Sequence, residues 1–574
     1  MKSKNLIAFS LIFGSILSAC STPSNNNSTN AQKTQTNIRF TDQTQKCGVN
    51  FKHIPTYTPD KFMPQILGSG VATADFNRDG APDILLVNSG AIDAKERSEE
   101  AKTRLYINDG KGNFADKTND WNLTSFGYGM GVAVGDFDND GWTDVFLTNY
   151  EGNNRLLRNV SGKFEDVTEK SGIKSDNSWT TSAGFGDFDG DGDLDLFVVR
   201  YVVYNKEVAQ KTYHNNLMTY SAPFLYQGIS DQIWRNDGNG KFTDVSKESG
   251  IASASLKGLA LAIGDIDKDG DTDIYVANDT NPNQLWINDG KGKFKDVAKL
   301  AGCAYSEGGR EEGSMGADFT DFDNNNLLDI AVPNFQEEST ALYSQESPML
   351  FREVSDAVGI GQAARARLKF GLDFFDADND SDEDLIVVNG HIEDNIEQNS
   401  DSVTFAQQNT LYENLGNGKF TDISDVSSEA LKDKQVSRGV AVADFNSDGL
   451  LDFVVSNNGG TAQIVFNETE KKGNFVGLWL EGEKTNRNAI GVRVVAKVGD
   501  KKIERQIMSA QSYLSVSDFR INLGLGEAQK IDELTIYWLG AEPQTLKDIQ
   551  SGKFYYIKQS KEPLEFVAGA KQIQ

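Results

Sequence analysis

Short apolar runs alternate with acidic turns along most of the chain. Gly131-Val-Ala-Val-Gly135 and Leu259-Ala-Leu-Ala-Ile263 are runs that precede such a turn, and Val145-Phe-Leu147 and Leu196-Phe-Val-Val199 are runs that follow one. Short runs rich in β-branched and aromatic residues, bordered by turn residues, are typical of strands. The pattern therefore predicts an all-β protein in which the acidic turns connect one strand to the next.

The acidic turns share one spacing of side-chain oxygens. Asp187-Phe-Asp-Gly-Asp-Gly-Asp-Leu-Asp195 has carboxylates at positions 1, 3, 5 and 9, and Gly192 at position 6 allows a positive φ. Alternate side chains of a tight turn converge on one point, and Ca²⁺ takes about six to eight oxygen ligands in a flexible shell. The backbone carbonyl of Asp193 at position 7 is a further expected ligand. The spacing predicts a calcium loop.

The spacing occurs seven times, which favours metal loops over the alternative of solvated acidic turns without metal. Position 12, a glutamate in EF-hands, is Leu147 in the second loop and Val198 in the third, so these are not EF-hands. We expect up to seven structural Ca²⁺ ions. The predicted ligands are Asp75, Asn77, Asp79 and Asp83; Asp136, Asp138, Asp140 and Asp144; Asp187, Asp189, Asp191 and Asp195; Asp265, Asp267, Asp269 and Asp273; Asp321, Asp323, Asn325 and Asp329; Asp376, Asp378, Asp380 and Asp384; and Asp444, Asn446, Asp448 and Asp452.

The formal net charge of −28 argues against nucleic acid and anionic membrane surfaces as partners. The predicted loops account for much of this charge, because most of their ligands are carboxylates. Without metal, each loop crowds three or four carboxylates together, and their repulsion destabilises the loop. The sequence therefore predicts a calcium-dependent fold.

A second motif lies between the calcium loops: a strand, an Asn/Asp-Gly turn, and Phe-x-Asp. Leu285-Trp-Ile-Asn-Asp-Gly-Lys-Gly-Lys-Phe-Lys-Asp296 is an example. Such turns favour hairpins because they accept positive φ, so each repeat supplies four strands, as a propeller blade does. Phe40-Thr-Asp42 has no calcium loop before it, and Gln463-Ile-Val-Phe-Asn467 has no Phe-x-Asp strand after it. We expect residues 38–470 to form a seven-bladed β-propeller closed by the N-terminal strand.

The first 37 residues are predicted to direct and tether the protein. Lys2 and Lys4 precede an apolar run of 12 residues, Leu6 to Leu17, which is shorter than the roughly 20 residues of a spanning helix. Leu17-Ser-Ala-Cys20 resembles a bacterial lipobox, which implies lipidation of Cys20; the alternative is a secretory signal cut after Ala19. Residues 1–20 are then the signal peptide with the lipidated cysteine, and residues 21–37 a flexible polar tether.

Residues 474–560 are predicted to form a separate small β domain, followed by a weakly structured tail, residues 561–574. Phe475-Val-Gly-Leu-Trp-Leu480, Gly491-Val-Arg-Val-Val-Ala496, Glu533-Leu-Thr-Ile-Tyr-Trp538 and Phe554-Tyr-Tyr-Ile557 are its candidate strands.

Several stretches resemble known families. The Asp-x-Asp-x-Asp-Gly-x-x-Asp loops between strands resemble the FG-GAP/VCBS repeats of integrin-α-type propellers. Gly68-Ser-Gly-Val-Ala72, Val388-Asn-Gly-His391 and Ser437-Arg-Gly-Val-Ala441 resemble the cartilage-acidic-protein-like bacterial family. Asn486-Arg-Asn-Ala-Ile-Gly-Val-Arg493 and Phe519-Arg-Ile-Asn-Leu-Gly-Leu-Gly526 resemble the ASPIC/UnbV domain, although Trp538-Leu-Gly-Ala541 replaces its usual Trp-Pro-Ser-Gly.

An insertion, residues 201–228, follows the third loop and carries five tyrosines: Tyr201, Tyr204, Tyr213, Tyr220 and Tyr226. The resembling family often has an insertion here with cysteines that this chain lacks. Aromatic residues on a loop over a rigid scaffold can stack on sugars or anchor a protein. The alternative is a loop that packs on the propeller itself.

The remaining chemistry is sparse. Cys47 and Cys303 are expected to be buried free thiols, with a disulfide between them as the alternative, because they follow strands of different blades. The three histidines, His53, His214 and His391, form no zinc spacing and no nucleophilic set with Ser or Cys; a structural hydrogen-bonding role is the expectation for His391.

These observations favour a calcium-stiffened binding or adhesion protein of the bacterial cell envelope. It would be lipid-anchored, on the outer membrane or cell surface, and would recognise an extracytoplasmic protein or glycan. The alternative is a propeller enzyme that acts on a polysaccharide or another extracytoplasmic substrate at the central channel. A deep channel lined by Arg, His and Tyr would favour the enzyme, and a plugged channel with exposed aromatic loops would favour binding.

Overall fold

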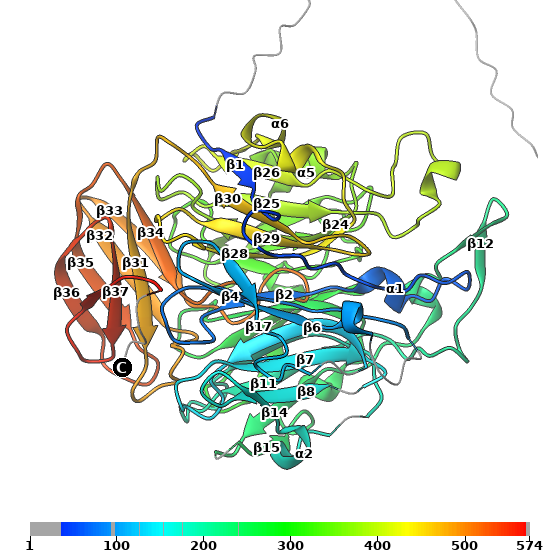
Figure 1. Cartoon of the computed structure of the whole chain (residues 1–574), viewed down its shortest axis with the longest axis horizontal. Helices are drawn as coiled ribbons and strands as arrows, with labels where there is room; N and C mark the ends of the chain where they lie inside the picture. The colour runs from blue at the N-terminus through cyan, green and yellow to red at the C-terminus, as the bar shows by residue number, and fades with distance from the viewer. Residues whose placement is uncertain are drawn as a thin grey trace, which may run out of the picture. The chain divides into compact units, whose positions relative to one another are not determined.

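The computed structural model describes residues 36–569 except 93–97, 125–126, 153, 175 and 239. The predicted signal peptide, Cys20 and most of the tether lie outside these residues. As the sequence predicts, the described chain is almost entirely β (Figure 1). Its helices are single turns: α1 (Pro64–Leu67), α2 (Thr168–Ser171), α3 (Ala298–Ala301), α4 (Ser355–Val358), α5 (Gly361–Ala364) and α6 (Ser424–Ser427), with 3₁₀ turns η1 (Glu99–Ala101), η2 (Pro223–Leu225), η3 (Ile251–Ser253), η4 (Ile396–Gln398) and η5 (Ala430–Lys432).

The repeat region forms four-stranded antiparallel sheets in a propeller-like arrangement. Six of them consist of strands consecutive within the repeat: β2 (Val71–Ala74), β3 (Asp83–Leu86), β4 (Arg104–Asn108) and β5 (Phe114–Asp116); β6 (Tyr128–Gly135), β7 (Asp144–Tyr150), β8 (Arg155–Asn159) and β9 (Phe164–Asp166); β10 (Thr180–Gly186), β11 (Asp195–Arg200), β14 (Gln232–Asn236) and β15 (Phe242–Asp244); β16 (Gly258–Gly264), β17 (Asp273–Asn278), β18 (Gln284–Asn288) and β19 (Phe294–Asp296); β20 (Asp318–Thr320), β21 (Asp329–Pro333), β22 (Thr340–Ser347) and β23 (Leu350–Glu353); and β24 (Lys369–Phe375), β25 (Asp384–Asn389), β26 (Thr410–Asn414) and β27 (Phe420–Asp422).

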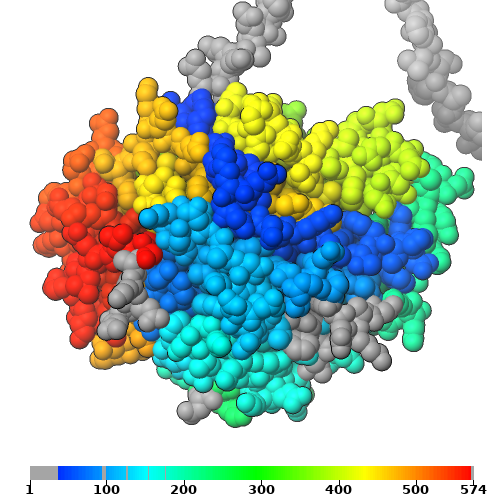
Figure 2. Space-filling view, in the orientation of Figure 1, coloured from blue at the N-terminus to red at the C-terminus, as the bar shows by residue number. Residues whose placement is uncertain are grey.

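A further sheet joins the two ends of the repeat region. It contains β28 (Ser437–Ala443), β29 (Asp452–Asn457) and β30 (Gln463–Asn467), and its outer strand is β1 (Phe40–Asp42). Phe40 pairs with Asn467 and Asp42 with Val465, so the N-terminal strand supplies the missing Phe-x-Asp strand, as predicted. Figure 2 shows the N-terminal segment, in dark blue, lying against the yellow residues of this sheet.

The first strands of the sheets contact one another in a closed succession. β2 contacts β6, followed by β10, β16, β20, β24 and β28, and β28 contacts β2 again. Aromatic rings link neighbouring sheets. The phenylalanine at position 2 of five acidic loops packs on the Phe-x-Asp phenylalanine of the adjacent sheet, for example Phe76 on Phe164 with ring centroids 6.1 Å apart.

The C-terminal part consists of two more four-stranded sheets that share one apolar core. Their strand orders are β34-β31-β37-β38 and β33-β32-β35-β36. Val476 and Leu523 of the first sheet and Val494 and Ile536 of the second belong to the same buried cluster. The bounds are β31 (Asn474–Glu481), β32 (Arg493–Val498), β33 (Lys501–Gln506), β34 (Ile521–Gly526), β35 (Lys530–Tyr537), β36 (Gln544–Gln550), β37 (Lys553–Lys558) and β38 (Leu564–Phe566).

The predicted weak structure of the tail is wrong where the structure describes it. β38 pairs with β37, with Phe554 opposite Phe566. The rings of Phe554 and Trp479 both pack on Phe566 at 5.8 Å. Aromatic contacts with strands earlier in the domain therefore hold the tail in the sheet.

Candidate metal centres

All seven predicted loops fold in the same way. The first aspartate of each loop accepts a hydrogen bond from the backbone N–H at position 6, at 2.6–3.1 Å. Position 6 has a positive φ in every loop, including Asn326 and Ser381, which occupy it in the fifth and sixth loops. The repeated spacing therefore specifies one backbone turn.

Five of the loops, among the described residues, bring three carboxylates together with ligand oxygens within 4.8 Å of one another. In the first and seventh loops an asparagine occupies position 3, and its amide donates to the aspartate at position 5. The clusters are Asp136, Asp138 and Asp144; Asp187, Asp189 and Asp191; Asp265, Asp267 and Asp269; Asp321, Asp323 and Asp329; and Asp376, Asp378 and Asp384.

The donor set fits a metal cation. One carboxylate oxygen of Asp138, Asp189, Asp265 and Asp321 is buried without a hydrogen-bond partner. Burial, followed by repulsion from neighbouring carboxylates, raises the pKa of the first aspartate in each loop, to about 7 for Asp136 and about 6 for Asp265. Buried oxygens of like charge that face one point are stabilised by a cation at that point.

The aspartate at position 9 has an additional role in every loop. Both carboxylate oxygens accept backbone N–H groups: in the first loop, Asp83 accepts from Phe76 at 3.0 Å and from Asn108 at 2.8 Å. The structure includes this residue in the cluster of the second, fifth and sixth loops, but not of the third and fourth. The predicted ligand at position 9 is thus first of all a clamp that fixes the loop to its own sheet.

An amide clip connects each loop to the loop of the preceding sheet. In the second sheet, the Asn159 side chain donates to the carbonyls of Thr143 in its own loop and of Phe76 in the first loop, at 3.2 and 2.9 Å. The other clip residues are Asn108, Asn236, Asn288, Gln345, Asn414 and Asn467, and the Asn108 side chain donates to Phe445 O of the last loop, which closes the cycle.

The clips were missed by sequence reasoning, although a signal exists. An amide residue ends the third strand of six sheets, and in the fifth sheet Gln345 lies two residues before the end of β22. Each clip satisfies two buried carbonyls, and leaving such groups unpaired is costly. The clips couple the geometry of neighbouring loops.

A segment of the C-terminal domain, residues 509–518, occupies the space surrounded by the first strands; we call it the plug. Ser512 exchanges two backbone hydrogen bonds with Ala317, and Val516 hydrogen-bonds Val71 and Thr73 of β2. Leu514 and Ala510 accept bonds from residues of β6 and β16. Tyr513 is fully buried, and its hydroxyl donates to Leu67 O at 2.7 Å. The sequence does not decide between a deep central channel and a plugged one. In the structure the space between the first strands is filled by the plug.

Arginines of the C-terminal domain face the acidic loops. Arg520 pairs with Asp518 at 2.6 Å and donates to Gly80 O of the first loop. Arg505 pairs with Glu383 of the sixth loop at 3.0 Å, and Arg487 donates to Asn139 O of the second. This domain thus supplies positive charge to the loops from outside the repeat region.

The tyrosine-rich insertion packs mainly on the protein itself, which is the second of the two alternatives that the sequence leaves open. Tyr201, Tyr204, Tyr220 and Tyr226 are buried, whereas Tyr213 is 63% exposed. The buried rings join a cluster with Trp179 and other residues distant in sequence. β12 (Thr212–His214) and β13 (Leu217–Thr219) form a hairpin that carries Tyr213.

The thiols and histidines have structural surroundings. Cys47 and Cys303 are buried and free, as expected. His53 contacts Ser89 Oγ at 2.9 Å, and His391 Nδ1 accepts the Glu393 N–H at 3.0 Å. Burial lowers the pKa of His391 to about 4. His214 lies in β12.

Two family models match the chain. The FG-GAP-like repeat matches residues 75–147, 136–198, 226–276, 265–332 and 376–455, together more than half of the chain. The ASPIC and UnbV family matches residues 482–564.

Curated relatives carry one name. Cartilage acidic protein 1 of Mus musculus is 24% identical over 507 residues, covering 82% of this chain and 70% of the relative. The Homo sapiens protein is 24% identical over 435 residues, covering 70% and 58%. The Xenopus tropicalis protein is 28% identical over 199 residues, covering 34% and 27%. The chain therefore spans only part of the length of these relatives.

Solved structures resemble the chain distantly. A lectin of Agrocybe aegerita that recognises non-reducing terminal N-acetylglucosamine is 15% identical, with 70% of this chain and 94% of that chain covered and a TM-score of 0.36. Rhamnogalacturonan lyase YesW is 13% identical, with 70% and 72% covered and the same TM-score. The repeat matches, together with the loop geometry, place the chain in the FG-GAP-like repeat family, with a C-terminal ASPIC and UnbV domain.

Proposed function

We propose that this protein is a calcium-dependent binding protein of the bacterial cell envelope, built on a seven-bladed β-propeller. The closed succession of first strands and the sheet shared by β1 and β30 support the ring. A lipid on Cys20 would anchor the protein, and the polar residues 21–37 would hold the propeller away from the membrane. Among the residues that the structure describes, no helix is long and apolar enough to cross a bilayer.

The metal that suits the loops best is Ca²⁺ in a structural role. The loops offer carboxylate, amide and carbonyl oxygens in a flexible, uneven shell, which Ca²⁺ accepts and Mg²⁺, with its strict octahedral geometry, does not. Each ion would neutralise three or four acidic groups and fix the loop. The clips would pass this rigidity to the neighbouring sheet, so calcium would stabilise the ring as a whole.

The single observation that carries the binding function is an exposed apolar rim on the insertion. The insertion leaves β11 at the end opposite the acidic loop, so it lies away from the plugged, calcium-bearing face (Figure 1). Four apolar residues of the insertion are exposed, and we call them the rim: Val203, Val208, Tyr213 and Phe224, which are 50%, 42%, 63% and 72% exposed. Exposed aromatic and aliphatic groups on a rigid scaffold are typical of recognition surfaces for protein or glycan.

The enzymatic alternative loses its expected site. Propeller enzymes use the central channel, and here the plug fills it with Tyr513 and Leu514, both buried. His53 and His391, which lie outside the plug, are also buried. The exposed rim therefore favours recognition over turnover.

Capture experiments test the function. The lipid-free protein, residues 21–574, is incubated in Ca²⁺ with envelope extract and, separately, with a glycan array. We expect a discrete protein or glycan to bind the wild type and to be lost in Tyr213→Ser/Phe224→Ser. Leu300→Ser, at another exposed apolar position (84% exposed), is the matched control. Equal binding by the rim variant refutes recognition through the insertion.

A further inference from the structure

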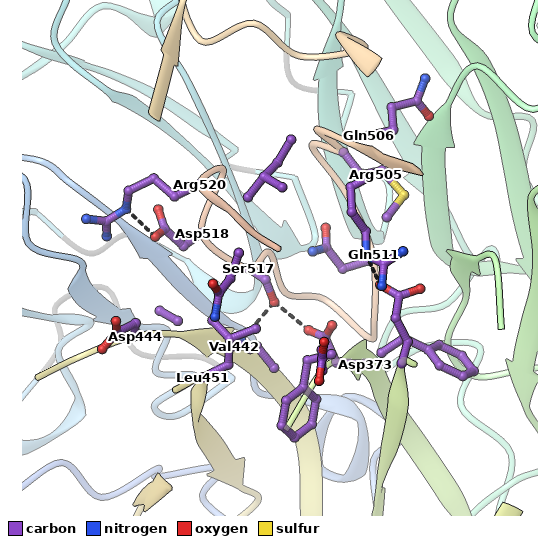
Figure 3. Close-up of a pocket in the computed structure, with 18 of the residues that line it drawn as sticks. Asp373, Val442, Asp444, Leu451, Arg505, Gln506, Gln511, Ser517, Asp518 and Arg520 are labelled. Atoms are coloured by element: carbon purple, nitrogen blue, oxygen red, sulfur yellow. Dashed lines mark hydrogen bonds and ion pairs between the residues drawn. The ribbon is translucent and has the colours of Figure 1, made fainter. Parts of the chain in front are cut away.

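A pocket of about 150 Å³ lies where the base of the plug meets the fifth, sixth and last sheets (Figure 3). Asp318 of β20 and Asp373 of β24 line it on one side, and Ser517 and Gln511 of the plug on the other. Neither aspartate belongs to a loop cluster, but the lining also includes Asp321, Asp376 and Asp444, the first residues of the fifth, sixth and last loops.

The two aspartates are buried carboxylates without a counter-charge. They are 2% and 4% exposed, and in the described part of the chain neither forms an ion pair. Asp318 accepts the N–H groups of Phe319 and Phe374, at 2.8 and 3.1 Å, and Asp373 accepts from Ser517 Oγ. The nearby Arg505 and Arg520 do not serve them, because these arginines pair with Glu383 and Asp518.

The pKa values of Asp318 and Asp373 agree with their burial without a counter-charge. Burial, followed by repulsion from Asp373, raises the pKa of Asp318 well above its usual range. Burial and the nearby Glu383 raise the pKa of Asp373 to about 7. Two adjacent buried carboxylates cannot both ionise cheaply without a proton or a cation between them.

An independent observation points to a ligand. Gln511 is 8% exposed, and its Oε1 is buried without a hydrogen-bond partner among the described residues. It lines the same pocket (Figure 3). A buried acceptor of this kind can accept a hydrogen bond from a donor group in the space in front of it. The pocket thus combines two uncompensated carboxylates with an unsatisfied neutral acceptor.

The remaining wall contains apolar side chains as well as charged ones such as Arg505, Arg520 and Glu383, and the volume exceeds that of a bare ion. Phe374, Val442, Leu451 and Ile521 contribute to the lining. A cavity of about 150 Å³ accommodates a molecule of benzene size, whereas a dehydrated metal ion gathers its ligands within about 2–3 Å. A ligand with a cationic head and a short apolar body satisfies both parts of the wall.

We propose that this pocket binds a small organic ammonium ion of about five or six heavy atoms. Its ammonium N–H groups would lie between Asp318 and Asp373 and donate to Gln511 Oε1, and its hydrocarbon part would contact Phe374 and Leu451. Because the pocket joins the plug to the repeat sheets, the ligand would also strengthen the docking of the C-terminal domain. This inference does not depend on the exposed rim or on the partner that it binds.

The test uses n-butylammonium as the probe, with the full lipid-free chain held in saturating Ca²⁺ and at constant ionic strength. Isothermal titration should give saturable 1:1 binding, and Asp318→Asn and Asp373→Asn should each weaken it at least tenfold. Gln511→Met, which keeps the side-chain length but removes the acceptor, should weaken it severalfold. Asp500→Asn, at an exposed position, is the control, and an unchanged calcium response of Tm shows that each variant folds.

Three outcomes overturn the proposal. They are the absence of saturable binding, equal affinity in the aspartate variants, and equal binding of the neutral 1-butanol. NaCl, KCl and additional CaCl₂ form a separate arm. If a metal ion alone raises Tm through Asp373 while n-butylammonium does not, the pocket is a metal site and the organic ligand is refuted.

Discussion

Replacing Asp265 by asparagine should reverse its effect on stability according to whether calcium is present. One oxygen of this carboxylate, Oδ1, is buried without a partner, and Oδ2 accepts the Gly270 N–H at 3.1 Å. Asparagine can keep the second contact and turn its NH₂ toward Asp267 and Asp269. The substitution therefore removes the charge and retains the hydrogen bond.

The magnitude follows from the pKa. Asp265 has a folded-state pKa raised from 3.8 to about 6. Without metal, a raised folded-state pKa means that stability is fully present below the unfolded-state value and is lost as pH rises through about 6. The loss is about 3 kcal/mol at roughly 1.4 kcal/mol per pKa unit. At pH 8 in EDTA, Asp265→Asn should thus be more stable than the wild type by up to about 3 kcal/mol.

In calcium the order should invert. At about one thousand times its Kd, a ligand stabilises the folded state by about 4.1 kcal/mol. The variant loses most of this at the fourth loop, which outweighs its gain of about 3 kcal/mol without metal. Urea unfolding in EDTA and in Ca²⁺, at pH 4 and pH 8, measures both effects. Asp500→Asn, at an exposed position, should change neither. Destabilisation of the same size in EDTA and in Ca²⁺ would refute the reasoning.

Three further expectations concern other parts of the molecule. Asn467→Ala removes the clip that joins the last two loops and leaves the carbonyls of Ala377 and Leu451 unpaired, so urea unfolding should show a loss of about 2–4 kcal/mol; an unchanged midpoint contradicts the clip. Arg520→Met leaves Asp518 without its partner and should cost about 3–5 kcal/mol, whereas Lys561→Met, at an exposed position, should have no effect in the same assay. Burial raises the pKa of the Cys47 and Cys303 thiols, so both should resist a thiol reagent in Ca²⁺ and react in EDTA with urea; reaction in the folded, calcium-loaded state refutes their burial.

The sequence predicts the repeat region well because its signals are local. The turn at each acidic loop depends on residues within nine positions, such as Asp187 and Gly192. The closing strand is also accessible, because Phe40-Thr-Asp42 and the incomplete last repeat can be matched by counting motifs. Short-range spacing is sufficient to predict the acidic loops, and strict repetition of the motifs is sufficient to predict the closing strand.

Other features depend on contacts between distant residues. Tyr204 in the insertion is buried because Tyr150 and Trp179 lie beneath it, and its own neighbours in sequence do not reveal this. Ser512-Tyr-Leu-Ser515 belongs by sequence to the C-terminal module, yet it hydrogen-bonds Val71 of the first sheet and Val132 of the second. The sequence predicts the position-9 aspartates only as metal ligands. Their role in fixing the loop is not visible there, because their backbone partners, such as Asn108, belong to a different strand.

The sheet shared by β1 and β30 determines how late in synthesis the repeat region can complete its folding. β1 is the first of the described strands to leave the ribosome, but its partner β30 follows more than four hundred residues later, and the plug later still. Until then the growing chain carries an unpaired strand at one end and a hollow lined by apolar first strands. A chain that ended before residue 509 would contain every acidic loop but would lack the plug. Translation must therefore be nearly complete before the molecule can reach its final form, and premature products should be prime substrates for proteases.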